Sequence, residues 1–140
     1  MMELITNRTE ADVLMGTARG TYSFADLNRV ETAVKELSEA AKELSVHFMP
    51  SVKTDWAYPG TFSADTWPTQ SQMLRYLDNV KQLCQKVGVT AKLPSSMENL
   101  NWKGANQIEE ALSAVNDKIE NVIQGFQYSG EIFAGEENVL

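Results

Sequence analysis

The feature that most constrains this chain is a periodic run of apolar residues between positions 27 and 44. Their spacing is 3-4-3-4-3, at Leu27, Val30, Val34, Leu37, Ala41 and Leu44. Such spacing places the side chains on one stripe of a helix that packs against other helices. The stripe covers about two and a half heptads, which is short for a free-standing coiled coil. Packing within one chain is therefore favoured, and packing against a second copy is the alternative.

Two further segments have the same kind of periodicity. In the segment 69–87 the stripe consists of Met73, Leu77, Val80, Cys84 and Val87. In the segment 102–127 it consists of Ile108, Leu112, Val115, Ile119, Val122 and Phe126. Sequence signals mark the helix ends: Ser23 with Asp26 and Thr69 with Gln72 have the spacing of capping boxes, and Gly88 is placed as a C-cap. We expect helices over 9–15, 24–45, 69–87 and 102–127, of which the first is a short amphipathic turn.

Three apolar stripes can close a single core, and no segment has a convincing two-residue period. The sequence therefore predicts a mainly α fold, a three-helix bundle over 1–127 that carries a short N-terminal helix. A long aromatic loop joins the first two long helices. The short connection 90–101 makes the second and third long helices antiparallel neighbours. Residues 128–140 form a separate C-terminal arm or tail.

The chain has 140 residues, one cysteine and one histidine. Cys84 and His47 cannot make an internal disulfide or supply the ligands of a zinc site. Cys84 lies on an apolar stripe as a small buried side chain, and His47 follows a helix between apolar neighbours. The carboxylates of the first and third long helices are expected on solvent-facing positions rather than as an acid/base pair; they are Glu36, Glu39, Glu43, Glu109, Glu110, Asp117 and Glu120. We expect no metal, no cofactor and no enzymatic activity.

The balance of charges narrows the partners. There are 12 Lys and Arg against 19 Asp and Glu, a formal net charge of −7. Binding to nucleic acid and to an anionic membrane surface both depend on basic residues, which are outnumbered and never form a run of three. The sequence has no apolar stretch long enough to cross a bilayer, and its N-terminus lacks the pattern of a signal peptide. We expect a soluble protein that binds neither nucleic acid nor membranes.

Aromatic residues gather in the loop 45–67, and the last segment has a repeat. Aromatics at this density either seal a small core, which we favour, or anchor an interface. The tail contains Tyr128-Ser129-Gly130-Glu131 and then Phe133-Ala134-Gly135-Glu136, a pattern that fits a β-arm and a frayed tail equally well. The candidate interaction residues are Trp56, Tyr58, Trp67, Trp102, Tyr128 and Phe133.

Several short stretches give the chain a resemblance to a known family. They are Asn7-Arg8-Thr9-Glu10-Ala11-Asp12-Val13, Gly20-Thr21-Tyr22-Ser23-Phe24-Ala25-Asp26-Leu27-Asn28-Arg29-Val30-Glu31, Lys53-Thr54-Asp55-Trp56, Pro68-Thr69, Gln72-Met73, Arg75-Tyr76-Leu77, Ala105-Asn106, Ile108-Glu109, Tyr128-Ser129-Gly130-Glu131 and Gly135-Glu136. On these, the chain resembles small modules of virion structural proteins, often tail-associated, from bacteriophages and prophages of Gram-positive gut bacteria such as Clostridia.

The resemblance implies a non-enzymatic structural or assembly module of a virion, assembled in the cytoplasm of the bacterial host. Its partners would be other virion proteins and further copies of itself. The alternative is a binding module that recognises a host-surface saccharide or protein through exposed aromatics. Beside the resemblance, we expect Asp55-Trp56 to dock against the Asn28-Arg29 side of the first long helix, with Asp55 as the charge partner of Arg29.

Overall fold

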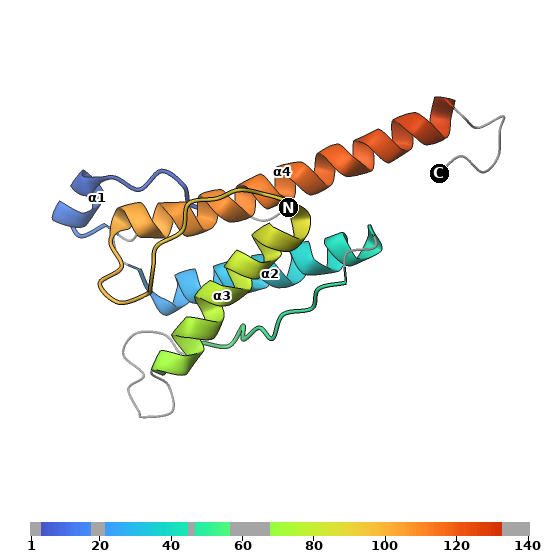
Figure 1. The fold of residues 1–140 in the computed structure, drawn as a ribbon. Helices are drawn as coiled ribbons and strands as arrows, with labels where there is room; N and C mark the ends of the chain where they lie inside the picture. Colours follow the sequence, from blue (N-terminus) through green and yellow to red (C-terminus); the bar gives the residue numbers. More distant parts are fainter. Residues whose placement is uncertain (1–3, 18–21, 45–46, 57–67, 133–140) are drawn as a thin grey trace.

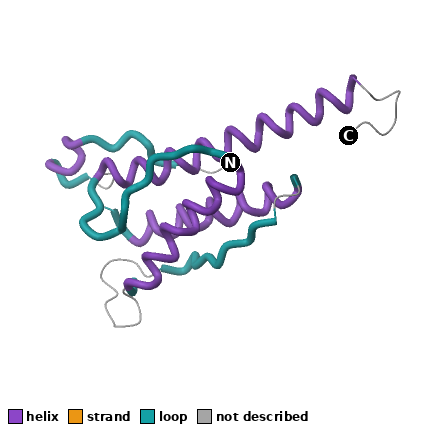
Figure 2. The backbone as a smooth tube through the Cα atoms, in the orientation of Figure 1, coloured by secondary structure: helices purple, strands orange, loops and turns teal. Residues whose placement is uncertain are grey.

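The computed structural model describes residues 4–17, 22–44, 47–56 and 68–132, with side chains as far as Gly125 in the last range. These residues form four helices, α1 (Glu10–Leu14), α2 (Phe24–Glu43), α3 (Gln70–Val87) and α4 (Trp102–Ile132). Figure 1 shows α2, α3 and α4 packed together and α1 set to one side. The described residues contain no strand, and loops join the helices (Figure 2). The predicted helical bundle is confirmed. The predicted antiparallel arrangement of α3 and α4 is wrong: the connection after α3 runs back along that helix toward its N-terminal end before α4 begins, so both helices point in the same general direction (Figure 1).

Local sequence signals account for where the helices begin and end. The box predicted at Thr69 forms, since its hydroxyl oxygen accepts from the backbone N–H of Gln72 and the Gln72 side chain accepts from the backbone N–H of Thr69. At Ser23, the carboxylate of Asp26 accepts from the backbone N–H at 2.6 Å and from the hydroxyl at 3.2 Å. Thr9 and Asp12 make another box, which opens α1. Gly88 ends α3 with φ of 86°, a left-handed conformation that glycine adopts without steric cost.

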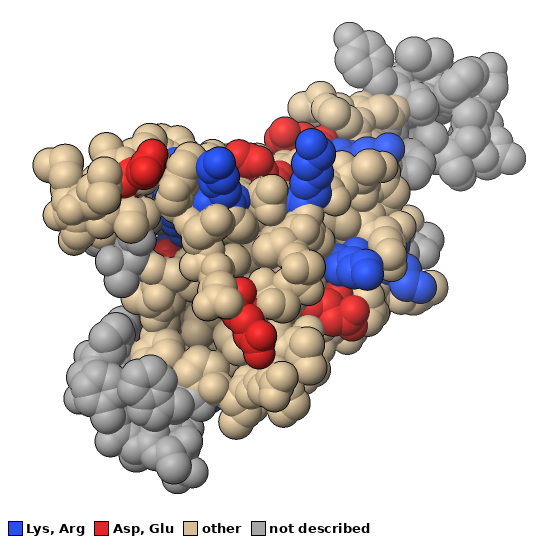
Figure 3. All heavy atoms as spheres, turned by 60° about the vertical axis from the view of Figure 1, so that its left-hand side comes forward, with Lys and Arg blue, Asp and Glu red and all other residues tan. Residues whose placement is uncertain are grey.

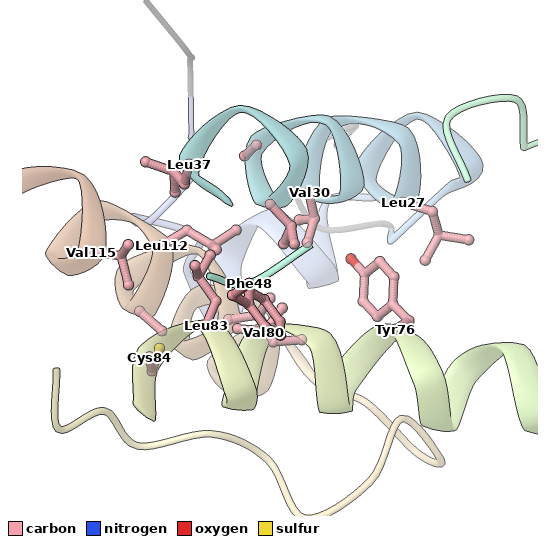
Figure 4. Packing of buried hydrophobic residues seen from close by; sticks show 14 of the residues in the cluster. Leu27, Val30, Leu37, Phe48, Tyr76, Val80, Leu83, Cys84, Leu112 and Val115 are labelled. Atoms are coloured by element: carbon pink, nitrogen blue, oxygen red, sulfur yellow. The ribbon is translucent and has the colours of Figure 1, made fainter. Parts of the chain in front are cut away.

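The core lies where the three long helices meet (Figure 4). The predicted stripe of α2 is buried from Leu27 to Ala41, and that of α4 from Ile108 to Ile119. The stripe of α3 is rotated from the prediction, because Tyr76 and Leu83 are fully buried while Met73 and Leu77 are only half-buried. Tyr76, Val80 and Leu83 share the 4-3 spacing of one helix face.

The described part of the long loop covers the core. Residues 47–56 run beside α2 and α3 in extended form (Figure 2). Phe48 and Trp56 insert at its two ends, with 9% and 3% of their surface exposed. The predicted sealing role therefore holds for this part, and residues 57–67 lie outside the described residues.

Helix α4 is longer than predicted. Its 31 residues give a rod of about 46 Å, whose C-terminal end projects beyond the rest of the bundle in Figure 1. Residues 128–132, predicted as the start of the arm, are helical, because glycines at 125 and 130 cost a helix only about 1 kcal/mol each and no proline intervenes. The β-arm or tail prediction for 133–140 lies outside the described residues.

The surface carries both charge signs. Figure 3 shows Lys and Arg interspersed with Asp and Glu over one face. Within the described part of the chain, none of the helices has the length and apolar character required to span a membrane.

Candidate functional site

The first described residues form an extended segment, residues 4–8, that we call the N-terminal arm. It runs antiparallel to the first half of α4, with Ile5 beside Glu109 and Arg8 beside Asn106. The side-chain amide of Asn106 binds both backbone groups of Arg8: it accepts from the N–H and donates to the carbonyl oxygen, each at 3.0 Å. The backbone N–H of Ile5 donates to Glu109 Oε1 at 3.0 Å. Side chains of α4 thus form hydrogen bonds with the backbone of the arm, as they would with the backbone of a bound extended peptide.

The side chain of Arg8 enters a cluster of four charged residues, the arginine–carboxylate cluster Arg8, Asp26, Arg29 and Glu109. Arg8 Nη2 lies 2.6 Å from Glu109 Oε2 and 3.3 Å from Asp26 Oδ1. Arg29, one turn after Asp26 on α2, bonds the same two carboxylates, with Nε at 2.7 Å from Glu109 Oε1 and Nη2 at 2.5 Å from Asp26 Oδ1. Two cations and two anions therefore alternate across the space between α2, α4 and the arm.

The cluster is almost completely enclosed. The exposed fraction of the side chain is 2% for Arg8, 7% for Asp26, 22% for Arg29 and 0% for Glu109. Burial by itself lowers the pKa of Arg29, but hydrogen bonds to Glu109 and Asp26 outweigh this and raise the pKa above its usual value. An enclosed, balanced network holds its members in one geometry, and removing one member leaves an uncompensated buried charge.

Two tyrosines cover the cluster on one side. The hydroxyl groups of Tyr22 and Tyr76 share a hydrogen bond between the start of α2 and α3. The guanidinium of Arg8 lies 5.7 Å from the centre of the Tyr22 ring, within the range of a cation–π contact. Burial raises the pKa of both phenols well above the ordinary value of 10.0, so both are protonated throughout the physiological range.

A second extended segment is held by the same device. Asn28 on α2 accepts from the backbone N–H of Trp56 at 2.9 Å and donates to its carbonyl oxygen at 3.4 Å. The indole inserts into the apolar core, while in the first clamp a guanidinium inserts into the charged cluster. One asparagine on each of two helices thus fixes one residue of an extended segment by both of its backbone groups.

The same loop is held further along by Glu31, whose surface is only 1% exposed. Its carboxylate accepts from the backbone N–H of Lys53 and lies 2.9 Å from Arg75 Nη2. Arg75 and Asn79 both donate to the carbonyl oxygen of Ser51. Burial raises the pKa of Glu31 above its ordinary 4.5, against the opposing effect of these partners.

The predicted aromatic candidates are not brought together by the described residues. Trp56 is buried, and Trp102 is partly exposed at the start of α4, with Lys103 Nζ 5.5 Å from its ring. Tyr128 belongs to α4, but its side chain lies outside the described residues. Tyr58, Trp67 and Phe133 also lie outside them.

The predicted docking of the loop on α2 is half correct. Trp56 does dock on Asn28, through the two bonds given above. The predicted ion pair between Arg29 and Asp55 is wrong, because Arg29 turns toward Asp26 and Glu109. The side chain of Asp55 is 85% exposed and pairs with Lys53 at 3.2 Å. A carboxylate already buried beside Arg29 outcompetes one that would have to leave water.

Sequence reasoning missed the cluster itself. Asp26 was interpreted only as a cap, and Glu109 was expected on the solvent side, where its neighbour Glu110 does lie. The available signal was spacing: Asn106 and Glu109 are three residues apart and flank the buried Ile108, as Asp26 and Arg29 are three apart around Leu27. Polar pairs at this spacing share the edge of a buried stripe.

Among the surface hollows are three that are lined by described residues. The first, of about 630 Å³, lies between α3 and the loop after it, and an adjoining one of about 400 Å³ shares Leu74 and Leu77 with it. The third, of about 260 Å³, lies beside the arm and is lined by Arg8, Tyr22 and Trp102 among others. Each is open to solvent and mixed in polarity.

The contacts described above are hydrogen bonds and ion pairs that hold extended segments of the chain against the helices. Both carboxylates of the cluster are paired with arginines. Burial raises the pKa of the Cys84 thiol, which disfavours the reactive thiolate. Over the described ranges, no three His, Cys, Asp or Glu side chains are grouped so as to hold a metal ion.

No family model, curated protein or solved structure matches the chain.

Proposed function

We propose that this chain is a non-enzymatic structural module of a phage or prophage virion, a tail or fibre component that acts through contacts with other virion proteins and with copies of itself. The virion assignment rests on the sequence resemblance given above. The mode of action rests on one structural observation, the projection of the C-terminal end of α4 beyond the bundle (Figure 1).

The apolar stripe of α4 continues into the projecting part. Ile119 is 3% exposed, Val122 is half-buried and Ile123 is 37% exposed. The burial given by the chain's own helices thus fades while the apolar spacing goes on toward residue 126. An apolar helix face that leaves its own bundle is suited to packing against a helix of another protein.

The experiment is sedimentation velocity on the full chain over a range of concentrations, with two variants. Ile123→Glu places a charge on the projecting face and should abolish self-association. Asn121→Glu, at a solvent-exposed position of the same helix, is the matched control and should retain it. A wild-type chain that stays monomeric at all concentrations and binds no tail protein contradicts the proposed mode of action.

The virion assignment has its own test. Particles purified after induction of the bacterial host should contain the chain, detected by mass spectrometry at a stoichiometry that follows the other structural proteins. Its absence from purified particles, when it is present in the lysate, contradicts the assignment whatever the oligomeric state.

The alternative, a module that binds a host-surface saccharide or protein through exposed aromatics, is supported by Trp102 alone among the described candidates. Trp102 is partly exposed and lines the hollow beside the arm. This alternative predicts that cell-wall fragments quench tryptophan fluorescence in the wild-type chain and not in Trp102→Phe. The buried Trp56 cannot stack on a ligand without opening the core.

A further inference from the structure

The contacts of the N-terminal arm are those of a peptide in a recognition site. Asn106 forms hydrogen bonds with the backbone N–H and carbonyl oxygen of Arg8, and Glu109 accepts from the N–H of Ile5. The guanidinium of Arg8 lies beside the carboxylates of Asp26 and Glu109. Arginine suits such a pocket, because its planar, permanently charged donors can serve several acceptors at once.

The arm lies in a groove between α2 and α4, formed by Asp26, Asn106 and Glu109. We propose that this groove is a site for an arginine-bearing extended segment, and that in the assembled protein the arm of a second copy fills it. The groove of one copy then takes its Arg8 from the next. This inference deepens the assembly role proposed above, on which it rests, but uses a surface separate from the projecting end of α4.

The connection between arm and bundle permits the exchange. The arm leads into α1, which contains no buried residue, and then through residues 15–22 to α2. Gly16 has φ of 66°, a left-handed conformation that glycine adopts, and leaves, at little steric cost. With α1 kept helical at about 1.5 Å per residue and the other residues extended at about 3.3 Å each, residues 10–22 can span roughly 34 Å, enough to reach an adjacent molecule. An arm from a second copy would recreate the contacts made in cis, which is why exchange of identical elements is a low-cost route to association.

The exposed surface of α1 favours the second copy as the occupant. Val13, Leu14 and Met15 are 45%, 80% and 78% exposed, a run of apolar side chains at the point where the arm leaves the bundle. In an exchanged pair this run is carried to the neighbouring molecule and can bury apolar surface there, a gain that the arm in cis does not have.

Because the arm is attached to its own chain, the conditions determine whether exchange of arms between copies can be measured. An arm attached to its own groove has an effective concentration in the millimolar range, so dilute wild-type chains keep their arms in cis. Exchange becomes measurable when cis binding is blocked or when copies are concentrated by assembly.

The test uses two full-length chains that are each defective on one side. Arg8→Ala has an intact groove and a defective arm, and Asn106→Ala has an intact arm and a defective groove. Both also carry Ile123→Glu, so that α4 cannot cause the association. Sedimentation should find each alone as a monomer and their mixture as a 1:1 heterodimer.

The control replaces Asn106→Ala by Asn121→Ala, an exposed position on the same helix. Its groove keeps its own arm in cis, so mixing it with Arg8→Ala should give far less heterodimer. A monomeric mixture of the two complementary chains, both with cooperative thermal unfolding, overturns the inference. It leaves the proposed function standing if wild-type self-association is still lost on Ile123→Glu.

A second measurement covers failure of Asn106→Ala to fold. A labelled peptide of residues 3–10 is titrated into the full-length Arg8→Ala chain and followed by fluorescence anisotropy. We expect saturable binding, weakened at least about tenfold when the peptide carries Arg8→Lys, because lysine is a point charge that cannot serve several acceptors in one plane. The absence of saturable binding also overturns the inference.

Discussion

Arg8 and Glu109 are separated by 101 residues in the sequence and lie 2.6 Å apart in the fold, Nη2 to Oε2. Their side chains are 2% and 0% exposed. The N-terminal arm is therefore part of the folded domain. It is held by this enclosed ion pair and by hydrogen bonds to its backbone, while Leu4 packs against the apolar core. Its removal would leave a carboxylate-lined gap in the bundle.

Glu109→Gln should be strongly destabilising. The amide keeps the size of the side chain but removes the charge that faces Arg8 and Arg29, and breaking a buried network of this kind costs about 3–5 kcal/mol. Urea unfolding followed by circular dichroism measures the free energy of unfolding. Glu110→Gln, on the exposed neighbour, should change it by no more than about 0.5 kcal/mol. Equal stability of the two variants would count against the enclosed cluster.

Asn28→Ala should lower the free energy of unfolding by about 1–3 kcal/mol, because it leaves the backbone N–H and carbonyl oxygen of Trp56 without their partner. The same unfolding measurement applies. Asn121→Ala on α4 is the control, since its side chain is exposed and its replacement by a good helix former should be neutral or stabilising. If Asn28→Ala matches the control, the clamp on the loop contributes nothing to stability.

Tyr22 and Tyr76 should make folding sensitive to alkaline pH. Their pKa values are raised in the folded chain, whereas an unfolded tyrosine ionises near pH 10. Above pH 10 the unfolded state therefore loses protons that the folded state keeps, and stability falls as pH rises.

The measurement for the tyrosines is the free energy of unfolding between pH 8 and pH 11.5. Tyr22→Phe combined with Tyr76→Phe should give a flatter dependence above pH 10, with ultraviolet titration of the phenols showing the loss of a late phase coupled to unfolding. A dependence equal to that of the wild type would mean that neither phenol is protected by burial.

Two glycines should respond in opposite directions to the same change. Gly88→Ala puts a Cβ at φ of 86° and should cost about 1 kcal/mol. Gly125→Ala lies in α4 with no atom within 4 Å of the added Cβ, and should stabilise by about 0.5–1 kcal/mol. Thermal unfolding of both variants measures the difference. A Gly88→Ala variant at least as stable as the wild type would contradict the assigned C-cap.

Much of the helical framework was predictable. Helix ends depend on a few neighbouring residues, such as Ser23 with Asp26 or Gly88, and the apolar stripes of α2 and α4 are visible as spacing. The rotation of the α3 stripe toward Tyr76 was not predictable. A tyrosine can lie in the core or at the surface, and which it does depends on whether its hydroxyl group finds a buried partner. Here that partner, Tyr22, lies 54 residues away.

In the candidate site, too, some features follow from the local sequence and others depend on tertiary contacts. The sequence by itself determined the helices to within a turn or so at most of their ends and the capping residues, which follow from periodicity and local hydrogen bonding. The bonds between Asn28 and Trp56 join residues 28 apart and belong to the tertiary structure. The tertiary structure alone decided which carboxylates are buried. Glu109 and Glu110 are adjacent and chemically alike, yet one is enclosed by two arginines and the other faces water. The physical reason is that a buried charge depends on a partner brought by another part of the chain, and Arg8 arrives from the far end of the sequence.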